Sequence, residues 1–179
     1  MIKKMIIITA SIAVVIFIAF TLVLWLFGGE LFFMAPSYNK MDRFLKTNFT
    51  ELSYVTNALF ELDYDSVEIT KIPLREVDKY NMKVGKDRVY ETIPIPDDLV
   101  VHIEILYKRG VNDISCGRGS VDFSVWAFMD EIRGITYSKT GLTLEDGQYI
   151  EVRQLSKENW FYYVNNFEKW KARNPQLFP

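Results

Sequence analysis

Apolar side chains run without interruption through the first part of the chain. From Met5 to Gly29 the sequence holds no charged residue over 25 positions, and most side chains are Ile, Val, Leu or Phe. A helix of this length measures about 37 Å, enough to cross a hydrocarbon core of about 30 Å with some tilt. The pattern predicts a transmembrane helix, with residues 1–34 forming the anchor and its flanks.

The alternative for this segment is a secretory signal that is removed after export. Such a signal has an apolar region of about 7–15 residues followed by a small-x-small cleavage site. The run here is longer, and the small residue after it, Ala35, is preceded by the bulky Phe32 and Phe33. An uncleaved anchor is therefore favoured over a cleaved signal or a buried helix.

Charges beside the predicted span indicate its orientation. Lys3 and Lys4 lie directly before the apolar run, whereas the first charge after it is Glu30. Since positive charges close to a span usually stay inside, we expect the N-terminus in the cytoplasm and residues 35–179 outside, as an extracytoplasmic domain. Basic residues farther along, at Lys40 and Arg43, make the number of positive charges nearly equal on the two sides of the predicted span.

A second helical pattern begins after Ala35-Pro36-Ser37, where proline breaks the first one. From Tyr38 to Glu61, apolar residues recur at steps of three or four, as one face of an amphipathic helix requires. Asn48-Phe49-Thr50 in the middle of this segment favours a bend, because Asn and Thr are weak helix formers.

The rest of the chain consists of short runs of β-forming residues, which are separated by turn residues. The clearest alternation runs from Leu99 to Tyr107, and a short helical turn is expected around Phe167 and Trp170. Short connections favour antiparallel pairing and argue against parallel βαβ units. The prediction is an α+β domain in which the amphipathic helix packs on a mainly antiparallel sheet of about five to seven strands. The predicted strands are Val67–Ile72, Arg88–Ile93, Leu99–Tyr107, Val121–Phe128, Glu131–Ser138, Tyr149–Leu155 and Trp160–Val164.

Charge and cysteine content exclude several classes of function. From Ala35 onward there are 19 Lys and Arg against 22 Asp and Glu, with no block of five like charges, so nucleic acid is not an expected partner. The lone Cys116 can form neither a disulfide within the chain nor a cysteine-based zinc site.

Few residues suggest catalytic or metal chemistry. A nucleophilic pair of Cys116 and His102 would need a fold that joins them, and inert roles are favoured. The acidic residues Asp63, Asp65 and Glu68, and the pair Asp97-Asp98, do not have the spacing of a calcium-binding loop. We therefore predict no catalytic residue, no metal site and no cofactor.

Weak candidates for ligand binding are Arg118, Trp126, Trp160 and Tyr162. Gly117-Arg118-Gly119-Ser120 offers backbone amides beside a guanidinium, as in a small anion nest, although a plain loop between strands is favoured. The aromatic residues suit a recognition surface, or the buried face of a sheet, which is the more common role.

Two stretches carry a resemblance, "ALFELDYDSVEIT" and "GITYSKTGLTLEDGQYIEVRQLSKENWFYYV". In them the sequence resembles uncharacterised single-pass, membrane-anchored or secreted proteins of bacteria, mainly Gram-positive ones. The resemblance implies a helix that runs into a strand and a terminal set of strands, but no activity. A helix packed on a curved antiparallel sheet is also similar in architecture to cystatin-like folds.

The leading hypothesis is a membrane-anchored extracytoplasmic binding or accessory protein of the cell envelope, with the bilayer as one partner through residues 5–29 and a protein as a possible second. The alternatives are a membrane-tethered enzyme and an immunity or sensing protein. An enzyme requires at least three side chains of the set His102, Glu104, Cys116, Arg118 and Asp122 to converge. A binding module requires a contiguous exposed aromatic patch with a polar rim.

Overall fold

The computed structural model describes residues 35–72, 80–117, 119–128, 130–144 and 148–175. The chain divides into two units, Met1–Ala35 and Pro36–Pro179, and the account below concerns the second. The predicted transmembrane helix lies outside the described residues. Within them, no helix combines the length and the apolar character that crossing a bilayer requires.

Helix α2 spans Tyr38–Glu61, the range that the apolar periodicity predicts. Its buried face includes Leu45, Leu52 and Leu59, which follow one another at helical intervals. The predicted bend falls at Asn48, which has non-helical φ and ψ of −115° and 15°. The Asn48 side chain donates a hydrogen bond of 2.8 Å to the Phe44 carbonyl, a local bond of the kind that competes with the helix backbone.

Eight strands form one antiparallel sheet in the order β3-β2-β1-β4-β5-β6-β8-β7. This confirms the α+β class and the antiparallel pairing, whereas the predicted number of five to seven strands is too low. The short strands β2 and β4 were not predicted. The strands are β1 (Ser66–Lys71), β2 (Tyr80–Lys86), β3 (Val89–Ile93), β4 (Asp113–Gly117), β5 (Ser120–Phe128), β6 (Glu131–Ser138), β7 (Tyr149–Gln154) and β8 (Trp160–Asn166).

The predicted strand Leu99–Tyr107 is wrong, because the segment belongs to helix α3, Asp97–Lys108. Its buried residues Leu99, Ile103 and Leu106 recur with helical spacing, while Val101 is 57% exposed. The segment is so rich in apolar residues that it fits both the two-residue period of a strand and the 3.6-residue period of a helix. The acidic first turn and the basic last turn, which match the helix dipole, are the signals that distinguish the two.

The chain's last described element is helix α4, Phe167–Arg173, which confirms the helical turn expected around Phe167 and Trp170. Asn166 caps it, since its side-chain oxygen accepts a hydrogen bond of 2.9 Å from the Lys169 amide.

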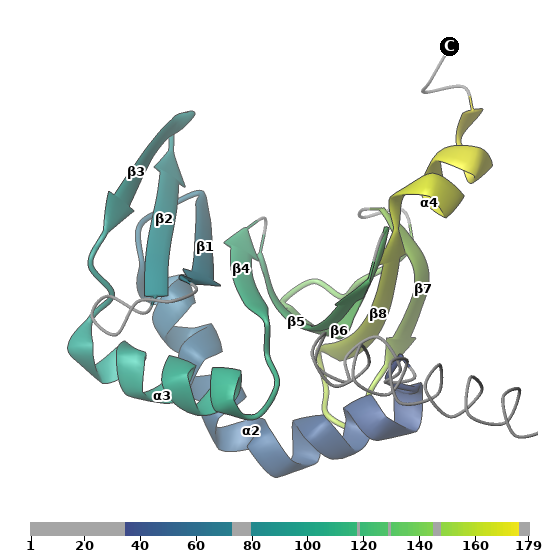
Figure 1. The fold of residues 1–179 in the computed structure, drawn as a ribbon, viewed down its shortest axis with the longest axis horizontal. Coiled ribbons are helices and arrows are strands. Elements are labelled where there is room, and N and C mark those ends of the chain that lie inside the picture. Colours follow the sequence, from purple (N-terminus) through teal and green to yellow (C-terminus); the bar gives the residue numbers. More distant parts are fainter. Residues whose placement is uncertain (1–34, 73–79, 118, 129, 145–147, 176–179) are drawn as a thin grey trace, which may run out of the picture. The chain divides into compact units, whose positions relative to one another are not determined.

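The sheet is strongly curved, and α2 and α3 lie on its convex side (Figure 1). Helix α2 contacts α3, β6 and β8, so one core joins the helices to one face of the sheet. No helix of the described residues lies in the hollow of the curve between β1 and β8 (Figure 1). The strands contribute to the core Val67, Ile69, Met82, Val84, Ile114, Val121, Phe123, Ile135, Trp160, Tyr162 and Val164.

Candidate functional site

The concave face of the sheet is built from polar positions that alternate with the core residues. On β1 and β4, for example, Val67 and Ile114 are buried against the helices, so Glu68 and Asp113 point to the opposite face. Strand register aligns these positions in rows that run across the sheet. One row is Glu68, Ser115, Asp122, Thr136 and Phe161; the next is Thr70, Asp113, Ser124, Gly134 and Tyr163.

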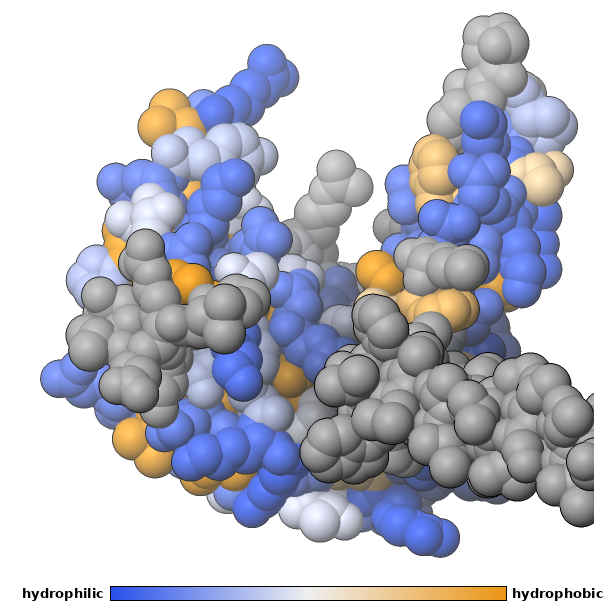
Figure 2. Space-filling view, in the orientation of Figure 1, coloured by the Kyte–Doolittle hydropathy of each residue, from blue (hydrophilic) through white to orange (hydrophobic). Residues whose placement is uncertain are grey.

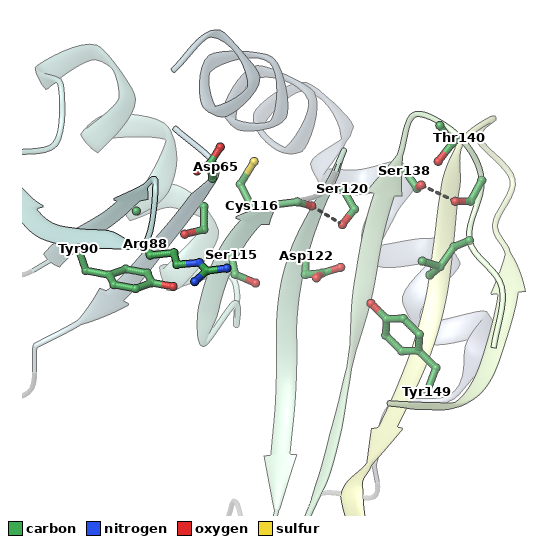
Figure 3. Close-up of a pocket in the computed structure, with 15 residues that line it drawn as sticks. Asp65, Arg88, Tyr90, Ser115, Cys116, Ser120, Asp122, Ser138, Thr140 and Tyr149 are labelled. Atoms are coloured by element: carbon green, nitrogen blue, oxygen red, sulfur yellow. Dashed lines mark hydrogen bonds between the residues drawn. The ribbon is translucent and has the colours of Figure 1, made fainter. Parts of the chain in front are cut away.

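A groove of about 680 Å³ lies on this face. Figure 2 shows polar side chains on both sides of the hollow between the two ends of the sheet. In Figure 3, Arg88 and Tyr90 reach toward Ser115 from one end, and Tyr149 points toward Asp122 from the other. A second cavity of about 330 Å³ is lined by Glu68, Lys83 and Asp113, and shares Ser66, Tyr90, Ser115 and Cys116 with the first.

Two carboxylates on the concave face are poorly solvated: Asp122 lines the groove, and Asp113 lines the second cavity. Burial raises the pKa of Asp113 to about 6, with the negative charge of Glu68 as the next cause. Burial also raises the pKa of Asp122, although a hydrogen bond from Thr136 opposes this shift. The Oδ1 atoms of Asp113 and Asp122 are both buried, and neither has a hydrogen-bond partner in the protein. These two oxygens are therefore buried acceptors without a partner in the protein.

Tyr163 on β8 lies close enough to both carboxylates to feel their charges. Its side chain is only 5% exposed and lies across Gly134 of β6, which pairs with Ser124 of β5. Burial raises the pKa of Tyr163 well above its usual value, and the nearby charges of Asp122 and Asp113 raise it further. Its ring meets that of Tyr149 edge to face, with the two centroids 5.4 Å apart.

The structure does not join the candidate nucleophile to the candidate base. Cys116 lines the groove, whereas His102 lies on α3 and stacks on Tyr54 of α2 with ring centroids 3.9 Å apart. Burial and the charge of Asp122 raise the pKa of Cys116 to about 11, so the thiol stays protonated at neutral pH. Of the set that an enzyme would bring together, the groove holds Cys116 and Asp122 but neither His102 nor Glu104.

Three of the four predicted ligand-binding candidates, Trp126, Trp160 and Tyr162, do not line the groove. Trp160 and Tyr162 are 3% and 2% exposed and belong to the core between the sheet and α2. Trp126 is half-buried, with the Arg133 guanidinium 5.8 Å from its ring and Phe128 beside it. Arg118 lies outside the described residues.

The acidic candidates are dispersed. Asp63 pairs with Lys86, Asp65 lines the groove and accepts a hydrogen bond of 2.9 Å from the Asp87 amide, and Asp98 accepts one of 2.8 Å from the Tyr54 hydroxyl. In the part of the chain that the structure describes, no three Cys, His, Asp or Glu side chains are placed to hold a metal ion.

Sequence reasoning missed most of the groove. The signal that was present is the polar half of each alternating strand, such as Ser120, Asp122 and Ser124 between buried apolar residues. Comparisons of the chain with protein-family models, with curated proteins and with solved structures found no match. The functional argument below therefore rests on the groove.

Proposed function

We propose that the protein is a membrane-anchored, extracytoplasmic binding or accessory protein whose ligand occupies the groove on the concave face. The observation that carries this proposal is the polar groove of about 680 Å³ on a sheet face that no described helix covers. The groove is lined by hydroxyl and carboxylate side chains from several strands and turns, among them Ser115, Asp122 and Ser138. Polar side chains that converge in a hollow are typical of a ligand-binding site.

The membrane part of the proposal rests on the sequence. The 25 uncharged positions from Met5 to Gly29 are long enough to anchor the chain, and Lys3 and Lys4 favour a cytoplasmic N-terminus. In this arrangement the groove opens outside the cell, so the ligand is one that is present at the membrane surface.

Binding is favoured over catalysis by the chemistry of the groove. Cys116, the only cysteine, is held as a thiol, and the only histidine of the chain lies on α3 against Tyr54. The groove thus offers hydrogen-bonding and charged groups without an activated nucleophile beside a histidine base.

Cell fractionation tests the location. We expect the full chain in the membrane pellet, released by detergent but not by high salt, and its C-terminal domain degraded when protease is added to intact cells. Recovery of the intact chain in the detergent-free soluble fraction would contradict the anchor, and protection from protease in intact cells would contradict the orientation.

Fragment mapping tests the groove. The full chain in a nonionic detergent is titrated with a set of small neutral, acidic and basic fragments while backbone amide resonances are followed by NMR. We expect shifts at Ser115, Asp122 and Ser138 in the groove, with Tyr54 and Asp98 on the helical side unchanged. Shifts confined to the helical side, or none, would overturn the proposal.

A further inference from the structure

We propose that the groove binds an uncharged carbohydrate, held between the rings of Tyr90 and Tyr149 and hydrogen-bonded to the hydroxyl side chains between them. This inference rests on the proposed function and names the class of ligand that the groove accepts. The observations behind it are two tyrosines at opposite ends of the groove, a lining rich in hydroxyl groups and a nearly balanced charge.

Tyr90 forms an aromatic platform at one end of the groove. It pairs with Gly85 in the register of β2 and β3, and a Cβ atom at position 85 would lie 2.7 Å from the Tyr90 Cε1 atom. The ring therefore lies against the bare backbone of β2, while the residue as a whole remains 63% exposed. The face of an aromatic ring carries partial negative charge, so an open ring of this kind suits the C–H groups of a ligand.

Tyr149 forms the counterpart at the other end. Its ring meets that of Tyr163 edge to face, and Tyr163 in turn lies over Gly134 of β6. Tyr90 and Tyr149 thus enter the groove from β3 and β7, the two outer strands of the sheet (Figure 3). A sugar ring presents C–H groups on its faces and hydroxyl groups around its edge, which matches aromatic ends and a polar floor.

Hydroxyl side chains line the groove between the two tyrosines. They are Ser66, Ser115, Ser120, Ser138 and Thr140. Ser120 and Ser138 donate hydrogen bonds to the carbonyl oxygens of Gly117 and Gly141 (Figure 3), so the lone pairs of these two hydroxyls can accept from a ligand. Arg88 adds N–H donors from the turn between β2 and β3. The groove therefore offers both the donors and the acceptors that a ligand hydroxyl requires.

The charges of the groove favour an uncharged ligand. Among the described residues that line it, Asp65 and Asp122 are the acids and Arg88 is the cation. Asp65 already accepts a hydrogen bond from the Asp87 amide, and Asp122 accepts one from Thr136. A mixed lining of this kind attracts neither anions nor cations strongly. The volume of about 680 Å³ lies within the range of about 300–1,000 Å³ that is typical of small-molecule sites.

The test uses the full chain in a polyoxyethylene detergent, which carries no sugar, and measures binding by calorimetry. The probes are neutral tetrasaccharides of glucose, galactose, mannose and N-acetylglucosamine. Their charged counterparts are the tetramers of galacturonate and glucosamine, and sorbitol serves as an uncharged polyol without a ring. We expect at least one neutral tetrasaccharide to bind, the charged tetramers to bind more weakly, and sorbitol not to bind.

Variants test the two platforms. Tyr90→Ala and, separately, Tyr149→Ala should each weaken tetrasaccharide binding about tenfold, the loss typical of an aromatic contact residue. Tyr90→Phe keeps the ring and should retain most of the affinity. Val89→Ala is the matched control, because Val89 is 69% exposed and precedes Tyr90 on β3, so its side chain points to the opposite face. Circular dichroism verifies that each variant is folded.

Three results would overturn the inference: no binding of any neutral tetrasaccharide, binding unchanged in both alanine variants, or binding of sorbitol or of a charged tetramer as tight as that of the neutral sugars. The fragment mapping described above separates this inference from the proposed function. If fragments enter the groove while no tetrasaccharide binds, the carbohydrate site fails and the proposed function stands; if neither fragment nor sugar enters, both fail.

Discussion

The phenol of Tyr163 covers Gly134 on the neighbouring strand: a Cβ atom at position 134 would lie 2.8 Å from the Tyr163 Oη atom and would collide with the Phe123 carbonyl oxygen. Gly134 is therefore required for the close approach of β8 and β5 around β6. Because the glycine leaves room, the Tyr163 side chain extends across β6 on the face that carries Asp122 and Asp113. A ring that covers a strand glycine also stabilises the strand pair.

Gly134→Ala should destabilise the protein by about 1–3 kcal/mol, the usual cost of an overpacked core, because the backbone of β5 has to move. Chemical denaturation of the full chain in detergent measures this. Gly117→Ala is the matched control on the same face, since its new Cβ would approach no atom closer than 3.4 Å. Equal effects of the two substitutions would contradict the role of Gly134.

Asp113 should make the free energy of unfolding fall as pH rises through about 6. Its pKa is raised from 3.8 to about 6, so the folded state holds a proton that the unfolded state releases between pH 4 and 6. The contribution is fully present below about pH 4 and lost above about pH 6. Discounted for partial solvent exposure, it amounts to about 1–2 kcal/mol.

Asp113→Asn should remove this part of the pH dependence and stabilise the protein above pH 6, as denaturation at a series of pH values would measure. Asp122, whose pKa is also raised, keeps a slope of the same sign in that variant. Glu158→Gln should leave the wild-type profile intact. A profile for Asp113→Asn identical to that of the wild type would exclude a raised pKa for Asp113.

Cys116 should react slowly with iodoacetamide. Burial and Asp122 hold its pKa at about 11, against about 8.5 for a free cysteine, so at pH 8 its thiolate fraction is more than 100-fold lower. Asp122→Asn removes one cause of the shift and should accelerate alkylation, measured by mass spectrometry. Reaction of the wild type as fast as a model thiol would show that the groove around Cys116 is open and unperturbed.

The kink of α2 should be stabilised by its contact with α3. Asn48 is 3% exposed and accepts a hydrogen bond of 2.7 Å from Arg109, at the end of α3. Asn48→Ala should lower the free energy of unfolding by about 1–3 kcal/mol, because it removes buried hydrogen bonds and leaves the Phe44 carbonyl without its side-chain donor. Lys108→Gln, which breaks only an exposed i,i+4 pair with Glu104, should cost less than about 0.5 kcal/mol.

Much of the fold could be predicted because several helices and strands show a clear periodicity of their apolar residues. Helix α2 and strand β6 have the predicted ends, since each repeats its apolar residues with one clear period. Segment 97–108 was misassigned because its apolar residues satisfy both periods. Strand β4, Asp113–Gly117, was missed because five residues with one buried position, Ile114, give almost no periodic signal.

The groove was harder to predict because it depends on register between strands. Asp113 and Asp122 are nine positions apart in sequence and separated by a turn, so only the pairing of β4 with β5 places them as diagonal neighbours. Sequence reasoning favoured large aromatic residues as binding candidates, yet Trp160 and Tyr162 are core residues. Polar residues at alternate strand positions were the better indicator, because nothing in the core explains them.

Site-specific photo-crosslinking in intact cells tests most directly whether the concave face is the binding surface. A photoreactive phenylalanine is placed in the full chain at Ser120 in the groove or, as the control, at Lys108 on α3. We expect adducts from position 120 and none from position 108. Adducts from position 108 alone would contradict the assignment of the groove as the ligand site.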